Sequence, residues 1–100
     1  MLQISPLELK NRLFSKEDIL LMDVRELHEH EAFNIGGVLI PLSEIMDRIS
    51  EIPLNKKVVL YCQMGIRSQI AIQRLQDKYG FTNLINLKGG IEAWKKEFAI

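Results

Sequence analysis

The sequence contains almost no cysteine: among its 100 residues there is one, Cys62. A single cysteine excludes an intramolecular disulfide framework, and it excludes a metal site built from several cysteines. Cys62 is therefore either a buried structural thiol or a reactive one. The residues that surround it in the sequence must distinguish these two roles.

An excess of charge of one sign is also missing, as is any long apolar run. Thirteen basic residues balance thirteen acidic ones without a block of like charge, so we expect no nucleic-acid partner and no anionic membrane partner. No apolar segment approaches membrane-spanning length, and the N-terminus has no basic start followed by an apolar run. These absences favour a cytoplasmic location.

With 47% hydrophobic residues, the chain is long enough to bury one core and too short for two. We therefore expect residues 1–100 to form a single domain. Apolar runs at residues 19–22 and 58–61 are typical of strands buried on both faces of a parallel sheet, and a weaker run at residues 84–87 is interrupted by Asn86. Helical patterns alternate with these runs, which predicts a three-layer α/β/α fold with a mostly parallel sheet.

Four helical segments are expected between and around these strands. The first begins at a capping box formed by Ser5 and Glu8. Pro6, directly after Ser5, occupies the first helical position. The second follows Ser43, and the third ends at Gly80. The fourth follows the pair Gly89-Gly90, which we interpret as a tight strand-to-helix turn.

The lone cysteine lies where such a fold usually binds ligands. Cys62 directly follows the strand at residues 58–61, and a helical pattern begins near Arg67. Ligands of open α/β sheets bind at the carboxyl ends of the strands, where the next helix presents its amide groups and its positive end. Gly65 permits a backbone turn that directs amides inward, and Arg67 adds a permanent cation. Because amides and cations favour the thiolate, Cys62 is a candidate nucleophile.

Several polar residues near this edge have simpler interpretations. Asp23 and Arg25 end the strand parallel to that of Cys62; they could shape the pocket, but we interpret them as a structural ion pair. Ser68 could donate its hydroxyl to the loop, but we prefer the role of helix cap. His28 and His30 do not share a helix face, so we interpret both as solvated surface residues and expect no metal site.

At this point the sequence resembles a known family, the rhodanese-like domains. The resemblance rests on the segment Cys62-Gln-Met-Gly-Ile-Arg67-Ser68, and on residues 23–26, 40–42 and 88–94, which fall in the family's order and spacing. It implies a three-layer α/β/α fold with a mostly parallel sheet of about five strands. It also implies a sulfurtransferase of the thiosulfate:cyanide type that needs no cofactor.

In such an enzyme, Cys62 would take a sulfane sulfur from a donor, either thiosulfate or a persulfide, and hold it as a persulfide. It would then pass the sulfur to an acceptor such as cyanide, a thiol or a partner protein. Backbone amides would stabilise the outer sulfur. The expected persulfide-binding loop consists of Gln63, Met64, Gly65, Ile66 and Arg67, with Ser68, Asp23 and Arg25 in supporting roles.

Two other classes of protein have related arrangements. Cysteine phosphatases place five residues between cysteine and arginine, whereas this chain has four between Cys62 and Arg67, and the shorter loop favours sulfur over phosphate chemistry. Non-catalytic binding or regulatory modules sometimes keep the fold and lose the cysteine, which is retained here. Both alternatives are therefore less favoured than the sulfurtransferase.

The composition of the loop bears on the sulfur donor. Gln63, Met64 and Ile66 are uncharged, so Arg67 is the only cation in the loop. We therefore expect thiosulfate, a dianion, to bind weakly. Our hypothesis is that the donor is a persulfide and that Met64 and Ile66 form part of an apolar docking rim.

Overall fold

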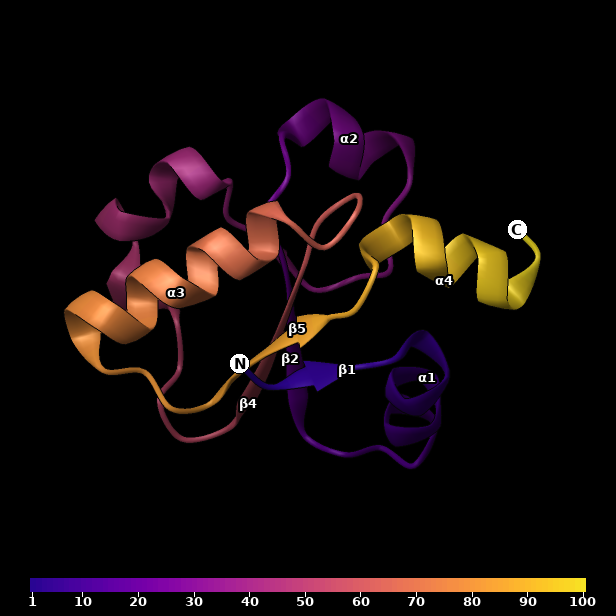
Figure 1. Ribbon diagram of the computed structural model, residues 1–100, viewed down its shortest axis with the longest axis horizontal. Coiled ribbons are helices and arrows are strands. Elements are labelled where there is room, and N and C mark those ends of the chain that lie inside the picture. The colour runs from indigo at the N-terminus through magenta and orange to yellow at the C-terminus, as the bar shows by residue number, and fades with distance from the viewer.

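The computed structural model describes residues 1–100 as one parallel sheet with helices on both faces (Figure 1). The strand order is β1-β5-β4-β2-β3, and every pairing is parallel. The fold class expected from the sequence is therefore confirmed. The strands are β1 (Gln3–Ile4), β2 (Ile19–Asp23), β3 (Val38–Leu39), β4 (Lys57–Tyr61) and β5 (Leu84–Leu87).

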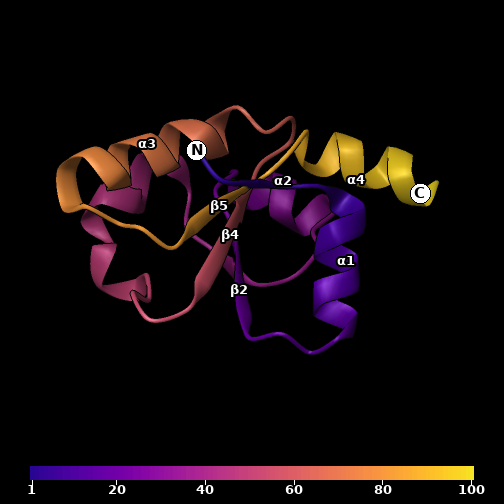
Figure 2. The ribbon, with the colours of Figure 1, turned by 60° about the horizontal axis from the view of Figure 1, so that its bottom comes forward.

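The sheet separates two apolar cores because successive side chains of each strand point to opposite faces. In β4, Val58 and Leu60 pack against α3, whereas Val59 and Tyr61 pack on the side of α1 and α4. Figure 2 shows α3 and α1 on opposite sides of the strands. The α-helices are α1 (Pro6–Phe14), α2 (Leu27–Ala32), α3 (Arg67–Tyr79) and α4 (Gly90–Phe98). None of them combines the length and apolar composition needed to cross a bilayer.

The predicted signals at helix ends are present in α1 and α3. The Ser5 side chain accepts a hydrogen bond from the Glu8 N–H at 3.1 Å, and Pro6 is the first residue of α1. At the C-terminal end of α3, Gly80 adopts the left-handed conformation, with φ of 69°. Both helices therefore begin or end where local sequence chemistry indicates.

The segment expected to be helical after Ser43 is helical, but it is not an α-helix. This segment forms two 3₁₀-helices, η1 (Leu42–Asp47) and η2 (Ile49–Glu51). Its backbone closes i to i+3 hydrogen bonds, such as the one from the Arg48 N–H to the Ile45 carbonyl at 3.2 Å. A 3₁₀-helix rises further per residue than an α-helix, and this segment packs beside α3 and buries Ile45 in the same core.

The turn before α4 holds the loop after β4 in place. Gly89 and Gly90 have φ of 75° and 60°, as expected of a tight turn. A Cβ at Gly90 would lie 2.3 Å from the Cys62 carbonyl oxygen. The same carbonyl accepts a hydrogen bond from the Ile91 N–H at 2.9 Å, and the Gln63 carbonyl accepts one from the Glu92 N–H at 3.0 Å. The start of α4 is therefore fastened directly to the Cys62 loop.

We predict that Gly90→Ala disrupts this joint. The added Cβ would combine backbone strain with a clash against the Cys62 carbonyl, so the free energy of unfolding should fall by about 3 kcal/mol or more. Gly80→Ala is the matched control, because Gly80 also has a positive φ but no atom lies near its Cβ position; it should cost about 1 kcal/mol. Urea denaturation measures both losses, and equal losses would contradict the role of close packing at Gly90.

Candidate active site

Cys62 lies at the carboxyl edge of the sheet, between the end of β4 and the start of α3. Figure 1 shows that this loop lies between α2 and the start of α4. The loop borders a pocket of about 320 Å³. The pocket is lined by Glu29, Cys62, Gln63, Met64, Ile66 and Arg67.

The Cys62 thiol is almost completely buried, with a 1% exposed fraction, at the base of this loop. Its Sγ accepts hydrogen bonds from the Gly65 N–H at 3.1 Å and the Ser68 N–H at 3.4 Å. Gly65 has φ of 86°, a conformation that turns its N–H back toward the sulfur. Two backbone dipoles therefore point at Sγ, which favours negative charge on the sulfur.

Other amides of the loop remain without a protein acceptor. The N–H groups of Gln63, Met64 and Ile66 make no hydrogen bond within the chain, and neither does the N–H of Arg67 at the first position of α3. Unpaired N–H groups at a helix start bind anions well. The loop can therefore donate hydrogen bonds to a negatively charged ligand atom held on Cys62.

Arg67 lies at the pocket as predicted, but its charge is already paired. Its guanidinium donates two hydrogen bonds to the Glu29 carboxylate of α2, at 2.7 and 2.8 Å. Glu29 Oε1 also accepts the Glu26 N–H at 3.0 Å, as part of the capping box of α2. The permanent cation expected at this position is therefore present, but Glu29, a partner that the sequence did not indicate, neutralises it.

This ion pair fixes the protonation of both partners. The Arg67 hydrogen bonds lower the pKa of Glu29 to about 2, although partial burial acts in the opposite direction. The same contact raises the pKa of Arg67. The Glu29 and Arg67 charges in the pocket lining therefore cancel at neutral pH.

Asp23 and Arg25 form the ion pair that the sequence predicted, and the pair is buried. Arg25 Nη2 donates to Asp23 Oδ2 at 2.8 Å, and the exposed fractions of the two side chains are 2% and 0%. Arg25 also reaches the reactive loop, because its Nη1 donates to Gln63 Oε1 at 3.0 Å. Gln63 in turn donates from Nε2 to Glu92 at 2.7 Å. The pair thus supports the Cys62 loop through Gln63.

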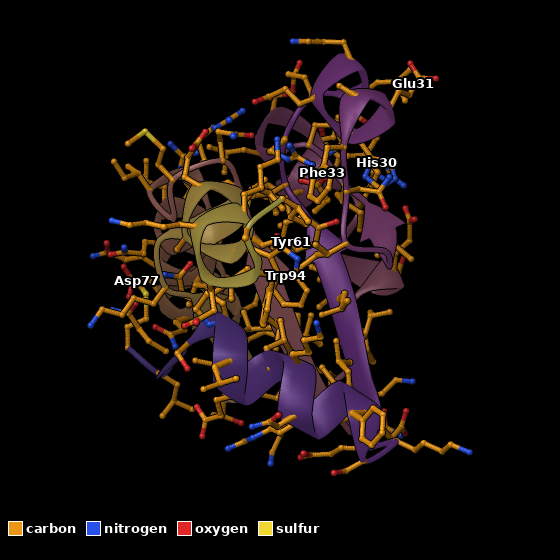
Figure 3. The ribbon with its side chains drawn as sticks, turned by 90° about the vertical axis from the view of Figure 1, so that its right-hand side faces the viewer. His30, Glu31, Phe33, Tyr61, Asp77 and Trp94 are labelled. Carbon is orange, nitrogen blue, oxygen red and sulfur yellow. The ribbon has the colours of Figure 1, made fainter.

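His30 is not a freely solvated residue, which corrects the expectation for this position. Its Nδ1 lies 2.9 Å from Asp23 Oδ2, and its side chain is 21% exposed. Figure 3 shows His30 and Phe33 toward the same end of the sheet as Tyr61, and the Phe33 carbonyl accepts a hydrogen bond from Arg25. His28, in contrast, is exposed as expected. The chain has no group of three or more residues suited to hold a metal ion.

Ser68 does not cap α3, contrary to the preferred interpretation. The helix begins at Arg67, with Ile66 at the cap position and no side-chain cap. Ser68 is fully buried within the first turn, where its hydroxyl donates to Asn86 Oδ1 of β5 and lies 3.4 Å from Cys62 Sγ. Its hydroxyl therefore belongs to the surroundings of the thiol.

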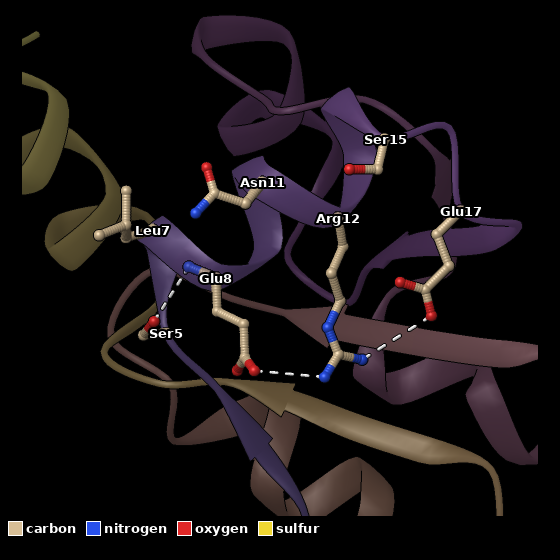
Figure 4. Close-up of a pocket in the computed structure, with 7 residues that line it drawn as sticks. All are labelled: Ser5, Leu7, Glu8, Asn11, Arg12, Ser15 and Glu17. Carbon is tan, nitrogen blue, oxygen red and sulfur yellow. Dashed lines mark hydrogen bonds and ion pairs between the residues drawn. The ribbon is translucent and has the colours of Figure 1, made fainter.

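A second and larger pocket, of about 420 Å³, lies beside α1 (Figure 4). Its one cation, Arg12, contacts Glu8 at 3.2 Å and Glu17 at 3.8 Å. No nucleophile comparable to Cys62 lines it. This pocket therefore offers no reactive centre of the kind that Cys62 provides.

Comparisons with known proteins agree with the fold of this chain. A family model described as Rhodanese-like domain matches residues 5–97. A protein called Sulfurtransferase from Allochromatium vinosum is 39% identical over 95 residues, which cover 94% of this chain and 88% of that protein. The human single-domain sulfurtransferase TSTD1 superposes with a TM-score of 0.84 at 28% identity, covering 97% of each chain.

A longer relative contains the same region as one part. The probable adenylyltransferase/sulfurtransferase MoeZ of Mycobacterium tuberculosis is 38% identical over 97 residues, which cover 94% of this chain. The chain spans only 24% of the length of MoeZ. The likeness therefore concerns one region of that protein.

We predict that Glu29 contributes to the acid sensitivity of the fold. Its folded pKa of about 2 lies below the ordinary value of 4.5, so its stabilising effect is complete above about pH 5 and is lost as the pH falls toward 2. Glu29→Gln should therefore lose less stability than the wild type between pH 5 and pH 2. Urea denaturation across this range measures the difference, with Glu31→Gln on the same helix as control. Parallel curves for wild type and Glu29→Gln would contradict the prediction.

Proposed function

Because this chain belongs to the rhodanese-like domain family, we propose that it is a sulfurtransferase that carries a sulfane sulfur on Cys62. The observation that carries this proposal is the position of Cys62 Sγ, which faces two backbone N–H groups beside a pocket. Relatives of similar length named as sulfurtransferases support it. The activity requires neither a metal nor an organic cofactor.

The reaction consists of two displacements at the transferred sulfur. The Cys62 thiolate attacks the outer sulfur of the donor, and the bond between that sulfur and the rest of the donor breaks. The donor leaves as a thiolate, or as sulfite when it is thiosulfate, and Cys62 becomes a persulfide. An acceptor nucleophile then attacks the outer sulfur, the bond to Sγ breaks, and the Cys62 thiolate returns. Electrons balance in both steps, so no external oxidant or reductant is needed.

The unpaired loop amides suit the loaded state. In a persulfide the negative charge resides on the outer sulfur, one bond beyond Sγ. The N–H groups of Gln63, Met64 and Ile66 lie in the loop that surrounds this position and have no competing acceptor. Fixed dipoles of this kind stabilise charge without reorganisation during the reaction.

The acceptor must come from outside the chain, because Cys62 is its only cysteine. Cyanide, a small thiol or a thiol of a partner protein can serve, and the first of these would make the enzyme a thiosulfate:cyanide sulfurtransferase. Met64 and Ile66 border the pocket with exposed fractions of 64% and 62%. We propose that this apolar rim contacts donors and acceptors larger than thiosulfate.

The pairing of Glu29 with Arg67 favours persulfide donors over thiosulfate. A dianion entering the pocket meets a guanidinium whose charge is cancelled and a carboxylate that stays ionised. The two negative charges of thiosulfate are repelled by the Glu29 carboxylate more strongly than the single charge on the sulfur of a small-thiol persulfide. We therefore propose a persulfide as the preferred donor.

We predict that Cys62 alone acquires sulfur. Reduced wild-type protein incubated with a small-molecule persulfide should gain the mass of one sulfur atom, and cyanide should remove it as thiocyanate. Cys62→Ser should gain nothing. Intact-mass spectrometry and a colorimetric thiocyanate assay measure the two steps.

Failure of both donors to load Cys62 would also be informative. If neither persulfide nor thiosulfate loads the wild type, while iodoacetamide still alkylates its thiol, then Cys62 is accessible but does not carry sulfur. The sulfurtransferase proposal would then be wrong, and a non-catalytic module would be the better description.

We also predict that Glu29 sets the preference between donors. Glu29→Gln removes the negative charge from the pocket while preserving the size of the side chain. The ratio of kcat/KM for thiosulfate to kcat/KM for the persulfide should rise about tenfold, since a full charge near a dianion is removed. Glu31→Gln, an exposed position on the same helix, should leave the ratio at its wild-type value. A fall in both rates with an unchanged ratio would show that the pair is only structural.

A further inference from the structure

One buried polar residue has no role in the chemistry described above. Asn86 interrupts the apolar strand β5, yet its exposed fraction is 0%. Burying an amide is costly unless its groups are hydrogen-bonded. Asn86 Oδ1 accepts the Ser68 hydroxyl, and Asn86 Nδ2 donates to Gln3 Oε1 at 3.3 Å. The side chain therefore links the N-terminal strand to the residue beside the reactive thiol.

The direction of these bonds follows from the atoms involved. The bond to Gln3 Oε1 places the Asn86 NH₂ group on the side away from Ser68. The Asn86 atom that faces Ser68 is then a carbonyl oxygen, which can only accept. A serine hydroxyl has one proton, and here that proton is committed to Asn86. At the 3.4 Å contact between Ser68 Oγ and Cys62 Sγ, the hydrogen must come from the thiol.

We propose that Asn86 is a positioning residue for Cys62, which acts by keeping Ser68 Oγ a hydrogen-bond acceptor toward Sγ. This arrangement stabilises a protonated thiol. A thiolate would face oxygen lone pairs, unless the hydroxyl turned toward the sulfur and left Asn86 Oδ1 unsatisfied in the interior. Asn86 thus opposes the two backbone N–H groups that favour negative charge on Sγ.

The consequence for sulfur transfer rests on the proposed persulfide chemistry. In the persulfide, Sγ is bonded to two atoms and carries no charge, because the charge lies on the outer sulfur. Ser68 can then keep its bond to Asn86 at no cost. The hydrogen bonds from Gln3 through Asn86 to Ser68 therefore favour the loaded state over the free thiolate.

The charged groups around the thiol stay the same when Asn86 or Ser68 is substituted. Glu29 and Arg67 line the pocket with Cys62 and pair with each other. Asp23, Arg25 and His30 lie behind Gln63, and Glu92 of α4 bonds Gln63 from the other side. Differences between variants of Asn86 and Ser68 therefore report the hydrogen-bond chain itself.

The test is the pH dependence of Cys62 alkylation by the uncharged reagent iodoacetamide. Asn86→Leu matches the side chain in size and frees the Ser68 proton to donate to Sγ. The midpoint of the pH profile should move toward acid by about one unit, because a hydrogen bond to a charged group is gained. In a Ser68→Ala background the same Asn86→Leu change should leave the midpoint where Ser68→Ala alone places it.

A loosened loop would give a different result. Greater exposure of Cys62 would raise the plateau rate without moving the midpoint, and circular dichroism with thermal melting identifies unfolded variants. Asn86→Val, which suits a strand better, serves if Asn86→Leu does not fold. An unmoved midpoint in a folded Asn86 variant, or an equal shift in the Ser68→Ala background, would overturn the proposal.

A second measurement needs no substitution at Asn86. The infrared S–H stretch of wild-type protein at mildly acidic pH, with Cys62→Ser as blank, should lie at lower frequency than the same band in Ser68→Ala, since a donating S–H bond is weakened. Coincident bands would contradict the assigned direction. The outcome is separate from sulfur loading, because both readouts concern the unloaded thiol.

Discussion

The parallel register of β2 against β4 is the constraint on which the site depends. Asp23 pairs with Tyr61, so the residues that follow each strand emerge side by side at one edge of the sheet. Arg25 and Gln63 each lie two residues beyond this pair and meet through a 3.0 Å hydrogen bond. A shift of one residue would turn the side chains of β2 to the opposite face, and the buried ion pair would lose its contact with the Cys62 loop.

The loop itself makes few local bonds and is held from three directions. Arg25 holds Gln63 from β2, Glu29 holds Arg67 from α2, and the first amides of α4 hold the carbonyls of Cys62 and Gln63. Preorganisation of this kind keeps the N–H groups of Gly65 and Ser68 directed at the sulfur without a ligand. The only cation that lines the pocket, Arg67, is already neutralised by Glu29, and the proposed preference between donors follows from this pairing.

Local patterns in the sequence predicted the parts of the fold that depend on local chemistry. The buried strands, the cap at Ser5, the turn before α4 and the position of Cys62 at a strand end all follow from periodicity and from the behaviour of proline and glycine. The roles of Glu29 and Ser68 did not follow. Their partners, Arg67 and Asn86, are 38 and 18 residues away, and no local pattern encodes such contacts. One signal for the Ser68 contact was present in the sequence. Asn86 is a polar residue inside an apolar strand, and such a residue needs a buried hydrogen-bond partner.

The pairing of β1 with β5 has a consequence for how the site is assembled during folding. Gln3 pairs with Asn86 across the sheet, and their side chains are hydrogen-bonded over a separation of 83 residues. Forming contacts of such long sequence separation requires closure of a long loop, which costs conformational entropy and slows folding. The α4 amides that fasten the Cys62 loop, those of Ile91 and Glu92, also lie well beyond Cys62 in the sequence. The surroundings of the thiol are therefore complete only when β1 has paired with β5 and α4 has docked on the Cys62 loop, so we expect the reactivity of the thiol to appear together with the whole fold.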